Sequence, residues 1–377
     1  MWDYDVIIVG AGPAGCGAAY DLCEKGFSVL LLDRSEFPRH KPCAGGLTIK
    51  SLRTLRYTVK PVIRNICTDI RISDKQNPYR TFQCQTPIVA MTVREEFDKY
   101  CLEKTVDKGA NFELIKSIKA ISQGEKEVVV ATDKNTFTAR YLIGADGANS
   151  TVRKLSGAFA KVKKGLAIEG LIENASFPTS TMELTFAELK MGYGWVFPKH
   201  DHLNVGLYTN DPQSDKINKK ALQAYVEPRF GNVEIKHITG HYVGLGGGKE
   251  LPGSGRILLC GDAAGYVDPI IGEGIYYAIK SGQLAAAAIA KTIDKNELAD
   301  QCYHELIHPF LYDLRGCYKA ADWLYQHLGL AKLGLRYLPA KSIFLKSFAH
   351  GLTLSEMKGQ MHALPFKKWK AFARLFE

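Results

Sequence analysis

The sequence predicts an α/β protein with three parts: a domain of alternating strands and helices, a β-rich domain, and a helical C-terminal segment. Three observations predict this class. A strand–helix–strand pattern opens the chain, strand-like runs fill residues 165–245, and helical patterns dominate from about residue 294 onward. The 377 residues, with 46% hydrophobic and 23% charged content, are typical of folded proteins with a large buried core.

The opening unit is predicted by its apolar runs and its glycines. Tyr4–Val9 is an apolar, β-branched run and is expected to be the first strand. A helix is expected over Pro13–Lys25, ended by Gly26, because glycine tolerates the positive φ that follows a helix. Phe27–Asp33 is expected to be the second strand, which completes a βαβ unit.

The turn between the first strand and the helix reads Gly-Ala-Gly-Pro-Ala-Gly and fits GxGxxG. Gly10 permits the tight turn, Gly12 lets the backbone approach a pyrophosphate, and Gly15 lets the helix pack on the strand. Asp33 ends the second strand, where a carboxylate accepts hydrogen bonds from ribose hydroxyls. The unit is therefore predicted to be of the Rossmann type. Its expected cofactor-binding residues are Gly10, Gly12, Pro13, Ala14, Gly15, Asp33 and Arg34.

Two later segments favour FAD over a nicotinamide dinucleotide. Tyr141–Gly144 and Ile257–Gly261 are strand-like runs, and each leads into a glycine-rich segment. A helix is expected over Gly274–Thr292, with its N-terminus toward the ligand. A reduced flavin carries negative charge around N1 and O2, which a helix N-terminus stabilises, whereas a reduced nicotinamide carries none. We therefore expect a Rossmann-type FAD-binding domain, with further binding residues Asp146, Asp262, Gly272, Gly274 and Ile275.

The charge of the chain is concentrated at its C-terminal end. Of the net charge of +10, the segment Ala331–Glu377, called here the basic tail, carries nine Lys/Arg and two acidic residues. Aromatic residues interrupt these charges, as at Tyr337, Phe344, Phe348, Phe366, Trp369, Phe372 and Phe376. Docked helices with a solvated basic face and peripheral contact with an anionic membrane both fit this pattern. Nucleic acid fits it least, and we expect no nucleic-acid partner.

The cysteines and the N-terminal residues indicate the cellular compartment in which the protein is expected. The nine cysteines include no CxxC pair, which argues against a disulfide framework and against a metal site. Asp3 falls within the first residues, and no basic stretch precedes an apolar run, so no signal peptide is expected. No run of eighteen apolar residues predicts a membrane span. We expect a cytoplasmic protein, with membrane association as an open alternative.

In its ordered set of motifs, the chain resembles the glutathione-reductase-type FAD superfamily, in the branch with hydroxylases, halogenases and geranylgeranyl reductases. The resemblance covers residues 1 to about 300. It identifies 144–153 (Asp146, Arg153) and 261–265 (Asp262) as the second and third FAD motifs. It also implies a position near the flavin for Arg94, whose alternative role is a salt bridge on a surface helix. Further cofactor contacts implied by the resemblance are Cys43, Ala44, Gly46 and Ile118.

Two segments resemble geranylgeranyl reductases in particular. Lys41-Pro-Cys-Ala-Gly-Gly46 matches a cysteine segment that these reductases place beside the isoalloxazine ring, although Ala44 stands where glycine is common. Tyr193-Gly-Trp-Val-Phe-Pro-Lys199 resembles their substrate-domain signature. The resemblance implies reduction of C=C bonds in a hydrophobic isoprenoid or lipid by hydride transfer from reduced FAD. The region after about residue 300 matches nothing in that family with confidence.

The expected catalytic residues are Cys43, Tyr193 and Trp195. Cys43 is a proton donor, a redox partner or a small residue beside the flavin, and Lys41 would make its thiol more acidic. Alternation along a strand places Tyr193, Trp195 and Phe197 on one face, either as walls of a dry cavity or as core packing. Glu273 either polarises the flavin end or caps a turn.

Other functions and the electron donor stay open. The shared FAD motifs also suit a monooxygenase or halogenase acting on a small aromatic substrate, and a flavin-binding sensor or scaffold is the non-enzymatic alternative. There is no second GxGxxG for NADPH, and Gly244–Gly248 is expected to be a turn, so the donor is NADPH or a protein such as ferredoxin. Expected boundaries are 1–50, 87–160 and 250–300 (FAD-binding), 51–86 and 161–249 (substrate), and 301–377 (helical, basic).

Overall fold

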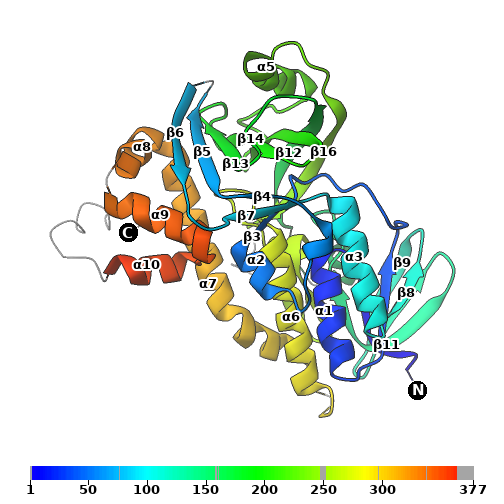
Figure 1. Ribbon diagram of the computed structural model, residues 1–377. Helices are drawn as coiled ribbons and strands as arrows, with labels where there is room; N and C mark the ends of the chain where they lie inside the picture. The colour runs from blue at the N-terminus through cyan, green and yellow to red at the C-terminus, as the bar shows by residue number, and fades with distance from the viewer. Residues whose placement is uncertain are drawn as a thin grey trace.

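The computed structural model describes residues 2–75, 77–157, 159, 161–246, 252–295, 297–336 and 338–362. Figure 1 shows two regions built on sheets, one above the other, with a group of C-terminal helices beside them. The lower region contains the first strand and helix of the chain, and the upper region contains the middle of the chain. The predicted fold class, an α/β FAD-binding fold with a β-rich part and a helical C-terminal region, is confirmed.

The lower sheet is centred on the N-terminal strand. β1 pairs in parallel with β2 on one side and with β11 on the other, and β18 continues the sheet beyond β11. The strand order is β17-β18-β11-β1-β2-β8, and the β9–β10 hairpin pairs with β11. The bounds are β1 Tyr4–Val9, β2 Val29–Asp33, β8 Asn111–Leu114, β9 Ile118–Gln123, β10 Val128–Thr132, β11 Thr136–Gly144, β17 Gly253–Ser254 and β18 Ile257–Leu259.

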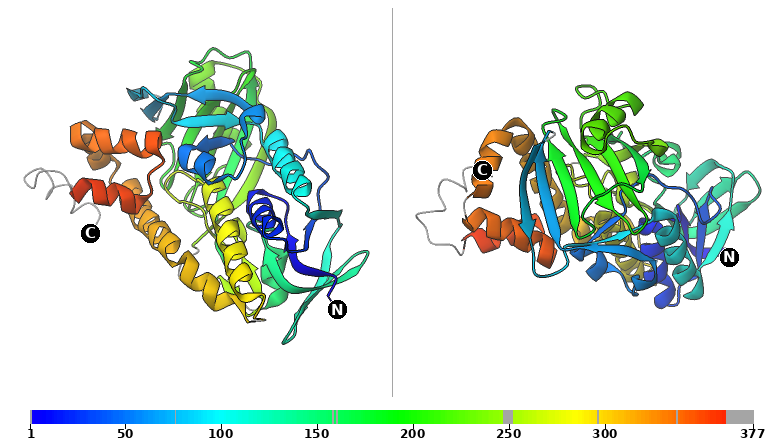
Figure 2. Two further views of the ribbon diagram at one scale, coloured as in Figure 1. Left: turned by 60° about the horizontal axis from the view of Figure 1, so that its bottom comes forward. Right: turned by 45° about the horizontal axis from the view of Figure 1, so that its top comes forward.

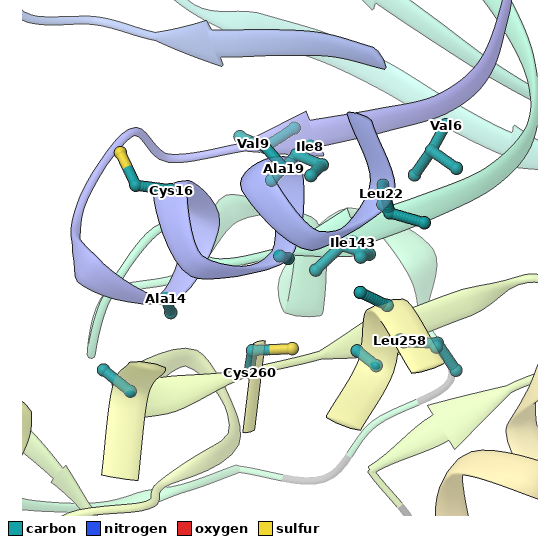
Figure 3. Packing of buried hydrophobic residues seen from close by; sticks show 14 of the residues in the cluster. Val6, Ile8, Val9, Ala14, Cys16, Ala19, Leu22, Ile143, Leu258 and Cys260 are labelled. Carbon is teal, nitrogen blue, oxygen red and sulfur yellow. The ribbon is translucent and has the colours of Figure 1, made fainter. Parts of the chain in front are cut away.

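Helices α1 (Pro13–Glu24) and α6 (Ile275–Thr292) cross closely because small residues meet between them. A Cβ added at Gly282 would stand 2.2 Å from the carbonyl oxygen of Ala14, so this contact requires glycine. Apolar side chains of α1 and β1, including Leu22 and Ile8, fill the core beside this contact (Figure 3). The first βαβ unit thus forms as the sequence predicts, with α3 (Arg94–Asp107) packed beside α1.

The upper sheet has seven strands in the order β16-β12-β15-β14-β13-β5-β6, and all neighbours are antiparallel except β13 and β5. Its strands are β5 Asp69–Asp74, β6 Asn77–Gln83, β12 Lys163–Glu173, β13 Thr181–Phe186, β14 Gly192–Pro198, β15 His202–Thr209 and β16 Lys236–Leu245. Helix α5 (Lys219–Phe230) covers one face, where Tyr225 and Leu222 are buried. The other face carries a second apolar cluster that includes Trp195 and Tyr208.

A small sheet, β3-β7-β4, joins the two regions. It consists of β3 Gly46–Thr48, β4 Ile63–Cys67 and β7 Val89–Thr92, with α2 (Ile49–Thr54) and the short helix η1 (Lys60–Val62) between its strands. The chain therefore leaves the FAD-binding region after β2 and returns to it at α3. The division into domains at the predicted boundaries stays a prediction.

Gly244 corrects one expectation. It lies within β16 and pairs with Lys164, whereas Gly244–Gly248 was expected to be a turn. A Cβ at Gly244 would stand 2.1 Å from the carbonyl oxygen of Asp262, so the glycine serves a close approach of two backbones. Gly246 follows the strand with φ +84°, and Gly247 and Gly248 lie outside the described residues.

Four helices end the described chain: α7 Ala299–Gln326, α8 Leu328–Arg336, α9 Leu338–His350 and α10 Leu354–His362. Figures 1 and 2 place α7 beside α6, and α8 and α9 beside the β5–β6 edge of the upper sheet. The rings of Phe82 and Phe344 are 5.6 Å apart across this contact, and Ser355 N–H donates to Asp313 at 2.8 Å. The described part of the basic tail is therefore docked on the protein.

The rest of the basic tail, residues 363–377 and Tyr337, lies outside the described residues. That part includes Phe366, Trp369, Phe372 and Phe376. Among the described residues, none of the helices is long and apolar enough to span a membrane.

Candidate flavin site and adjoining cavity

The glycine turn before α1 has the geometry of a phosphate cradle. Gly10 has φ +105°, and a Cβ there would stand 2.4 Å from the carbonyl oxygen of Ala145. A Cβ at Gly15 would stand 1.8 Å from the carbonyl oxygen of Gly10, so the helix packs against the strand through this glycine. At Gly12 the space is open, since the nearest atom is a guanidinium nitrogen of Arg39 at 3.6 Å.

The N-terminus of α1 is free to bind an anion. Gly12 is the N-cap, no side chain caps it, and Pro13 occupies the first turn. Uncapped N–H groups at a helix N-terminus favour a phosphate. Asp33, at the end of β2, holds the turn in place, because its carboxylate accepts from the N–H groups of Ala11 at 2.7 Å and Ser35 at 2.9 Å. The neighbouring Arg34 is exposed.

The second motif follows β11 and is tied to the third. The Oδ2 atom of Asp146 accepts from the N–H of Thr151 at 2.6 Å, at the start of α4 (Thr151–Ser156). Its Oδ1 atom is buried and has no hydrogen-bond partner among the described residues. Burial raises the pKa of Asp146. Arg153 donates to the carbonyl oxygens of Ala148 at 3.0 Å and Ala263 at 2.6 Å, which joins the two motifs.

The third motif begins with the short helix η2 (Gly261–Ala264), directly after β18. Asp262 accepts from the N–H of Gly244 at 3.1 Å, and burial raises its pKa. The segment ends at Gly272, with φ +63°, and Gly274, the N-cap of α6. Gly274 has no side chain to cap α6, which begins at Ile275, but the Glu273 carboxylate accepts from the N–H of Tyr276 at 3.4 Å in its first turn.

A cluster of cations lies between these segments. Arg39 and Arg94 both contact Asp98, at 3.0 and 2.8 Å. Burial lowers the pKa of Lys41 to about 8, with the charge of Arg94 adding to the effect. Burial, together with the positive charges of Lys41, Arg94, Arg39 and Arg34, lowers the pKa of His241 to about 3. Such a concentration of positive charge suits an anionic ligand such as a pyrophosphate.

These features together fit FAD. The open space at Gly12 and the uncapped α1 would hold the pyrophosphate, the orphaned oxygen of Asp146 would accept from the cofactor, and α6 would face the flavin. Ile118 opens β9 and packs against the main core. Its predicted contact with the cofactor stays a prediction, as do the individual roles of the other binding residues.

Arg94 forms a salt bridge within helix α3, and its predicted position near the flavin stays a prediction. Its guanidinium forms a bidentate i,i+4 pair with Asp98, with both contacts at 2.8 Å, but the arginine is buried and does not lie on the surface. Burial lowers its pKa, but the charges of Asp98 and Cys43 outweigh this effect and raise it overall. Cys43 therefore lies within electrostatic reach of Arg94, on the cationic side of the site.

The Cys43 segment is held by both regions of the protein. Gly45 N–H donates to the Cys43 thiol at 3.5 Å, and Lys199 donates to the carbonyl oxygen of Ala44 at 2.6 Å. A Cβ at Gly46 would stand 2.9 Å from the Phe197 ring. Burial lowers the pKa of Lys199 to about 8. The sequence prediction did not include Lys199, although it ends the aromatic motif.

The rings of Tyr193, Trp195 and Phe197 share one face of β14, as alternation predicts. Tyr193 and Trp195 are buried with ring centroids 6.1 Å apart. Trp195 donates to Asn204 at 2.7 Å, and the Tyr193 hydroxyl donates to the carbonyl oxygen of Ile271. These rings belong to the second apolar cluster, so core packing accounts for their burial.

A cavity of about 310 Å³ adjoins this cluster. Tyr193, Trp195 and Phe197 are not among the residues that line this cavity, and they belong to the apolar cluster behind its wall. Its walls come from the upper sheet, the loop before α6, and helices α7–α10. The apolar lining residues are Ile72, Leu184, Phe186, Ile270, Ile271, Ala320, Trp323, Leu324, Leu328, Leu330, Ala331, Leu335, Phe344, Phe348, Leu352, Leu354 and Met357.

Polar groups gather at one end of the cavity. Lys50, on α2, forms an ion pair with Glu273 at 2.8 Å and lies 4.7 Å from the ring centroids of both Tyr276 and Tyr277. Thr48 donates to the other carboxylate oxygen of Glu273 at 3.0 Å. The sequence prediction missed Lys50 as a site residue, since its only local signal is its position soon after the Cys43 segment.

Comparisons with known proteins identify the family to which this chain belongs. Residues 3–311 match the FAD binding domain family. An uncharacterized protein of Methanosarcina barkeri is 33% identical over 96% of this chain and 94% of its own length. A menaquinone reductase of Mycolicibacterium smegmatis is 32% identical over 75% of each chain. A geranylgeranyl diphosphate reductase of Rhodobacter capsulatus is 30% identical over 79% of this chain and 78% of its own.

Solved structures show the same fold. A geranylgeranyl bacteriochlorophyll reductase-like protein of Thermoplasma acidophilum superimposes with a TM-score of 0.80 at 21% identity, over 94% of this chain and 98% of its own. A flavin-dependent brominase superimposes with a TM-score of 0.73 at 19% identity, over 92% and 93%. The chain therefore belongs to the FAD binding domain family, in its geranylgeranyl reductase group, and it is an FAD-dependent oxidoreductase.

Proposed function

We propose that this protein reduces C=C bonds in the isoprenoid chain of a lipid, using FAD as the hydride donor. The observation that carries the proposal is the apolar cavity of about 310 Å³. It extends from the buried loop that precedes α6, at Ile271 and Glu273, to Leu330 on α8, which is 52% exposed. A hydrophobic chain can therefore reach from the surface to the end of the cavity that adjoins the third FAD motif.

The lining favours a branched hydrocarbon chain over a small polar aromatic. The cavity has the size of ordinary ligand pockets, roughly 300 Å³ or more, and its walls are almost entirely aliphatic and aromatic. Its one buried cation is already paired, because Lys50 contacts Glu273. A diphosphate would find no uncompensated positive charge at this end. We therefore place the hydrocarbon chain, and not its head group, beside the cofactor.

When bound and reduced, FAD would supply a hydride, which carries both electrons of the reduction. The chain supports that chemistry in three ways. The glycine turn and Asp146 would hold the cofactor, the N-terminus of α6 would stabilise negative charge on it, and the apolar walls would exclude water. Cys43, Tyr193 and Trp195 stay predicted site residues. Cys43 is proposed to contact the cofactor, and the two rings to fix the strand behind the cavity.

Delivery of such a substrate suits a membrane surface. Helix α8 exposes Leu330 and Leu333, at 52% and 47%, and Lys332 between them pairs with Asp74. Exposed apolar side chains on one helix favour contact with the interface of a bilayer. We propose that α8 contacts the membrane at the point where the cavity opens. The identity of the electron donor, NADPH or a protein such as ferredoxin, stays a prediction.

The test is an anaerobic single turnover. The purified holoprotein is reduced with dithionite and mixed with geranylgeraniol or a membrane lipid extract, and flavin absorbance is followed. We expect reoxidation without oxygen, and lipids that gain two hydrogens per turnover by mass spectrometry. Reoxidation only after air is admitted, stimulated by a small aromatic, would instead indicate a monooxygenase. No reoxidation by any substrate would indicate the sensor or scaffold.

A pair of variants tests the cavity itself. Ala320 lines the cavity and is buried on α7, whereas the adjacent Lys319 is exposed. Ala320→Phe is expected to fill the cavity and to abolish reoxidation by geranylgeraniol while FAD stays bound. Lys319→Phe places the same ring on the outer face of α7 and is expected to leave the reaction unchanged. Equal activity in the two variants would exclude this cavity as the substrate site.

A further inference from the structure

Asp268 lies at the polar end of the cavity, in the loop between η2 and α6. It lines the cavity although only 6% of its surface is exposed. The loop is fixed by its own backbone, because the N–H of Asp268 donates to the carbonyl oxygen of Glu273 at 2.9 Å. This turn places the carboxyl group in the cavity wall next to the ion pair of Lys50 and Glu273.

The two oxygens of the Asp268 carboxyl differ. Its Oδ1 atom accepts from the N–H of Ile270 at 2.8 Å, which fixes the orientation of the group. Its Oδ2 atom accepts no hydrogen bond from the described residues. One oxygen is therefore anchored, and the other is available to carry a proton toward a ligand in the cavity.

The surroundings keep this carboxyl protonated at higher pH than usual. Burial raises the pKa of Asp268 to about 6, the charge of Lys50 opposes this effect, and the charge of Glu273 adds to it. The ammonium of Lys50 pairs directly with Glu273, so Asp268 is the carboxyl that takes up a proton. The titratable groups that face it are Lys50, Glu273, Tyr193, Tyr208, Tyr277, Cys317, Tyr318 and Tyr325.

We propose that Asp268 donates the proton that completes reduction of a C=C bond in this cavity, an inference that rests on the function proposed above. The π bond of the alkene breaks, and one carbon gains a hydride from two-electron-reduced FAD. The other carbon gains the proton of the Asp268 carboxyl, so a C–H bond forms as the O–H bond breaks. Reduced FAD is oxidised by two electrons, the alkene is reduced, and the carboxylate regains a proton from solvent.

The other candidate acids are less suited to this step. An isoprenoid alkene is unactivated, so its protonation needs the strongest acid that is still protonated near neutral pH. The Tyr193 hydroxyl is committed to the carbonyl oxygen of Ile271, and burial raises its pKa further above its usual value of 10. Cys43 does not line the cavity. After transfer, the ammonium of Lys50 remains in place to stabilise the new carboxylate.

The experiment compares Asp268→Asn and Asp268→Glu holoprotein with the parent in the anaerobic turnover with geranylgeraniol. General acid catalysis contributes roughly 10²–10⁴-fold. We expect Asp268→Asn to lower the reoxidation rate by at least about 100-fold. The parent rate should fall as the pH rises through about 6, and this dependence should be absent in Asp268→Asn and restored in part by Asp268→Glu. Asp322→Asn, which changes an exposed acid on α7 that does not line the cavity, is the matched control.

A readout without turnover separates a chemical role from a structural one. Infrared difference spectra of the apoprotein should show a protonated carboxyl band that titrates near pH 6 in the parent and is missing in Asp268→Asn. Binding of geranylgeraniol, followed by fluorescence of Trp323 in the cavity wall, should be equal in both proteins. A parent spectrum that lacks this band, together with a pH dependence of turnover that Asp268→Asn leaves unchanged, would overturn the proposal for Asp268.

The outcomes also separate this inference from the proposed function. If the parent protein is not reoxidised by any isoprenoid, the proposed function fails, whatever Asp268 does. If the parent turns over and Asp268→Asn turns over equally fast, the function stands and another group donates the proton. If Asp268→Asn binds geranylgeraniol and FAD but fails to turn over, both proposals are supported.

Discussion

Replacing Lys50 by methionine removes the cation that pairs with Glu273 at the polar end of the cavity while keeping a side chain of similar length. The Lys50 ammonium lies 2.8 Å from Glu273, and the two side chains are 15% and 5% exposed. Glu273 and the nearby Asp268 would then be buried without a counter-charge. Breaking a buried ion pair by removing one partner costs about 3–5 kcal/mol, so Lys50→Met is expected to lower the free energy of unfolding by about this amount at about pH 8.

The loss should depend on pH in a defined direction. Without Lys50, the pKa of the Asp268 carboxyl rises further in the folded protein, because the opposing charge is gone. A carboxyl whose folded pKa is raised contributes stability at low pH and loses it as the pH rises through that pKa. The destabilisation by Lys50→Met should therefore be largest at about pH 8 and smaller at about pH 5.

The assay is urea unfolding of parent and variant at both pH values, followed by circular dichroism. Lys99→Met is the matched control, because Lys99 pairs with Glu103 at 3.6 Å while the two side chains are 48% and 54% exposed. Exposed pairs of this kind contribute about 0.5 kcal/mol or less. Equal losses in the two variants, or a loss in Lys50→Met that does not change with pH, would refute the electrostatic reasoning.

Three further predictions follow from the same structure. Gly12→Ala should fold normally but bind FAD at least about 10-fold more weakly by fluorescence titration. Gly15→Ala, whose Cβ would stand 1.8 Å from a carbonyl oxygen, should instead lower the free energy of unfolding in urea by about 1–3 kcal/mol. Equal stability of the two variants would contradict the packing role of Gly15. Asp268→Asn should stabilise the apoprotein relative to the parent by up to about 3 kcal/mol as the pH rises from about 4 to above 6. A carboxyl pKa raised from 3.8 to about 6 costs the parent that much free energy of unfolding once the carboxyl ionises. A stability difference that does not change with pH would argue against the raised pKa. Leu330→Ser combined with Leu333→Ser should reduce cosedimentation with anionic vesicles while leaving flavin content unchanged, and unaltered cosedimentation would exclude α8 as the contact.

The parts of the site that depend on local geometry could be predicted from the sequence. Gly10 and Gly15 have the turn and packing roles that their spacing implies, because a turn between a strand and a helix has few backbone solutions. The first strand and helix of the chain also form at the predicted places. Each of these features is determined within about thirty neighbouring residues.

The features that could not be predicted depend on contacts between distant residues. Lys50 and Glu273 are 223 positions apart in sequence, and only the packing of α2 against α6 brings them together. Alternation correctly places Tyr193 and Trp195 on one face of a strand, but it cannot show whether a cavity or other side chains cover that face. Here other buried side chains cover it, and the cavity lies beyond them.

The cavity is lined by two parts of the sequence, one inside and one outside the region that matches the family. The family match ends at residue 311, whereas much of the cavity wall comes from residues 317–357, in helices α7–α10. Under the proposed function, substitutions in α8–α10 would change which substrates fit the cavity without altering the glycine turn before α1. A library of variants confined to this short stretch would then test new substrates on one unchanged cofactor site. Much of the cavity wall can therefore change in sequence independently of the segments that are predicted to bind the cofactor.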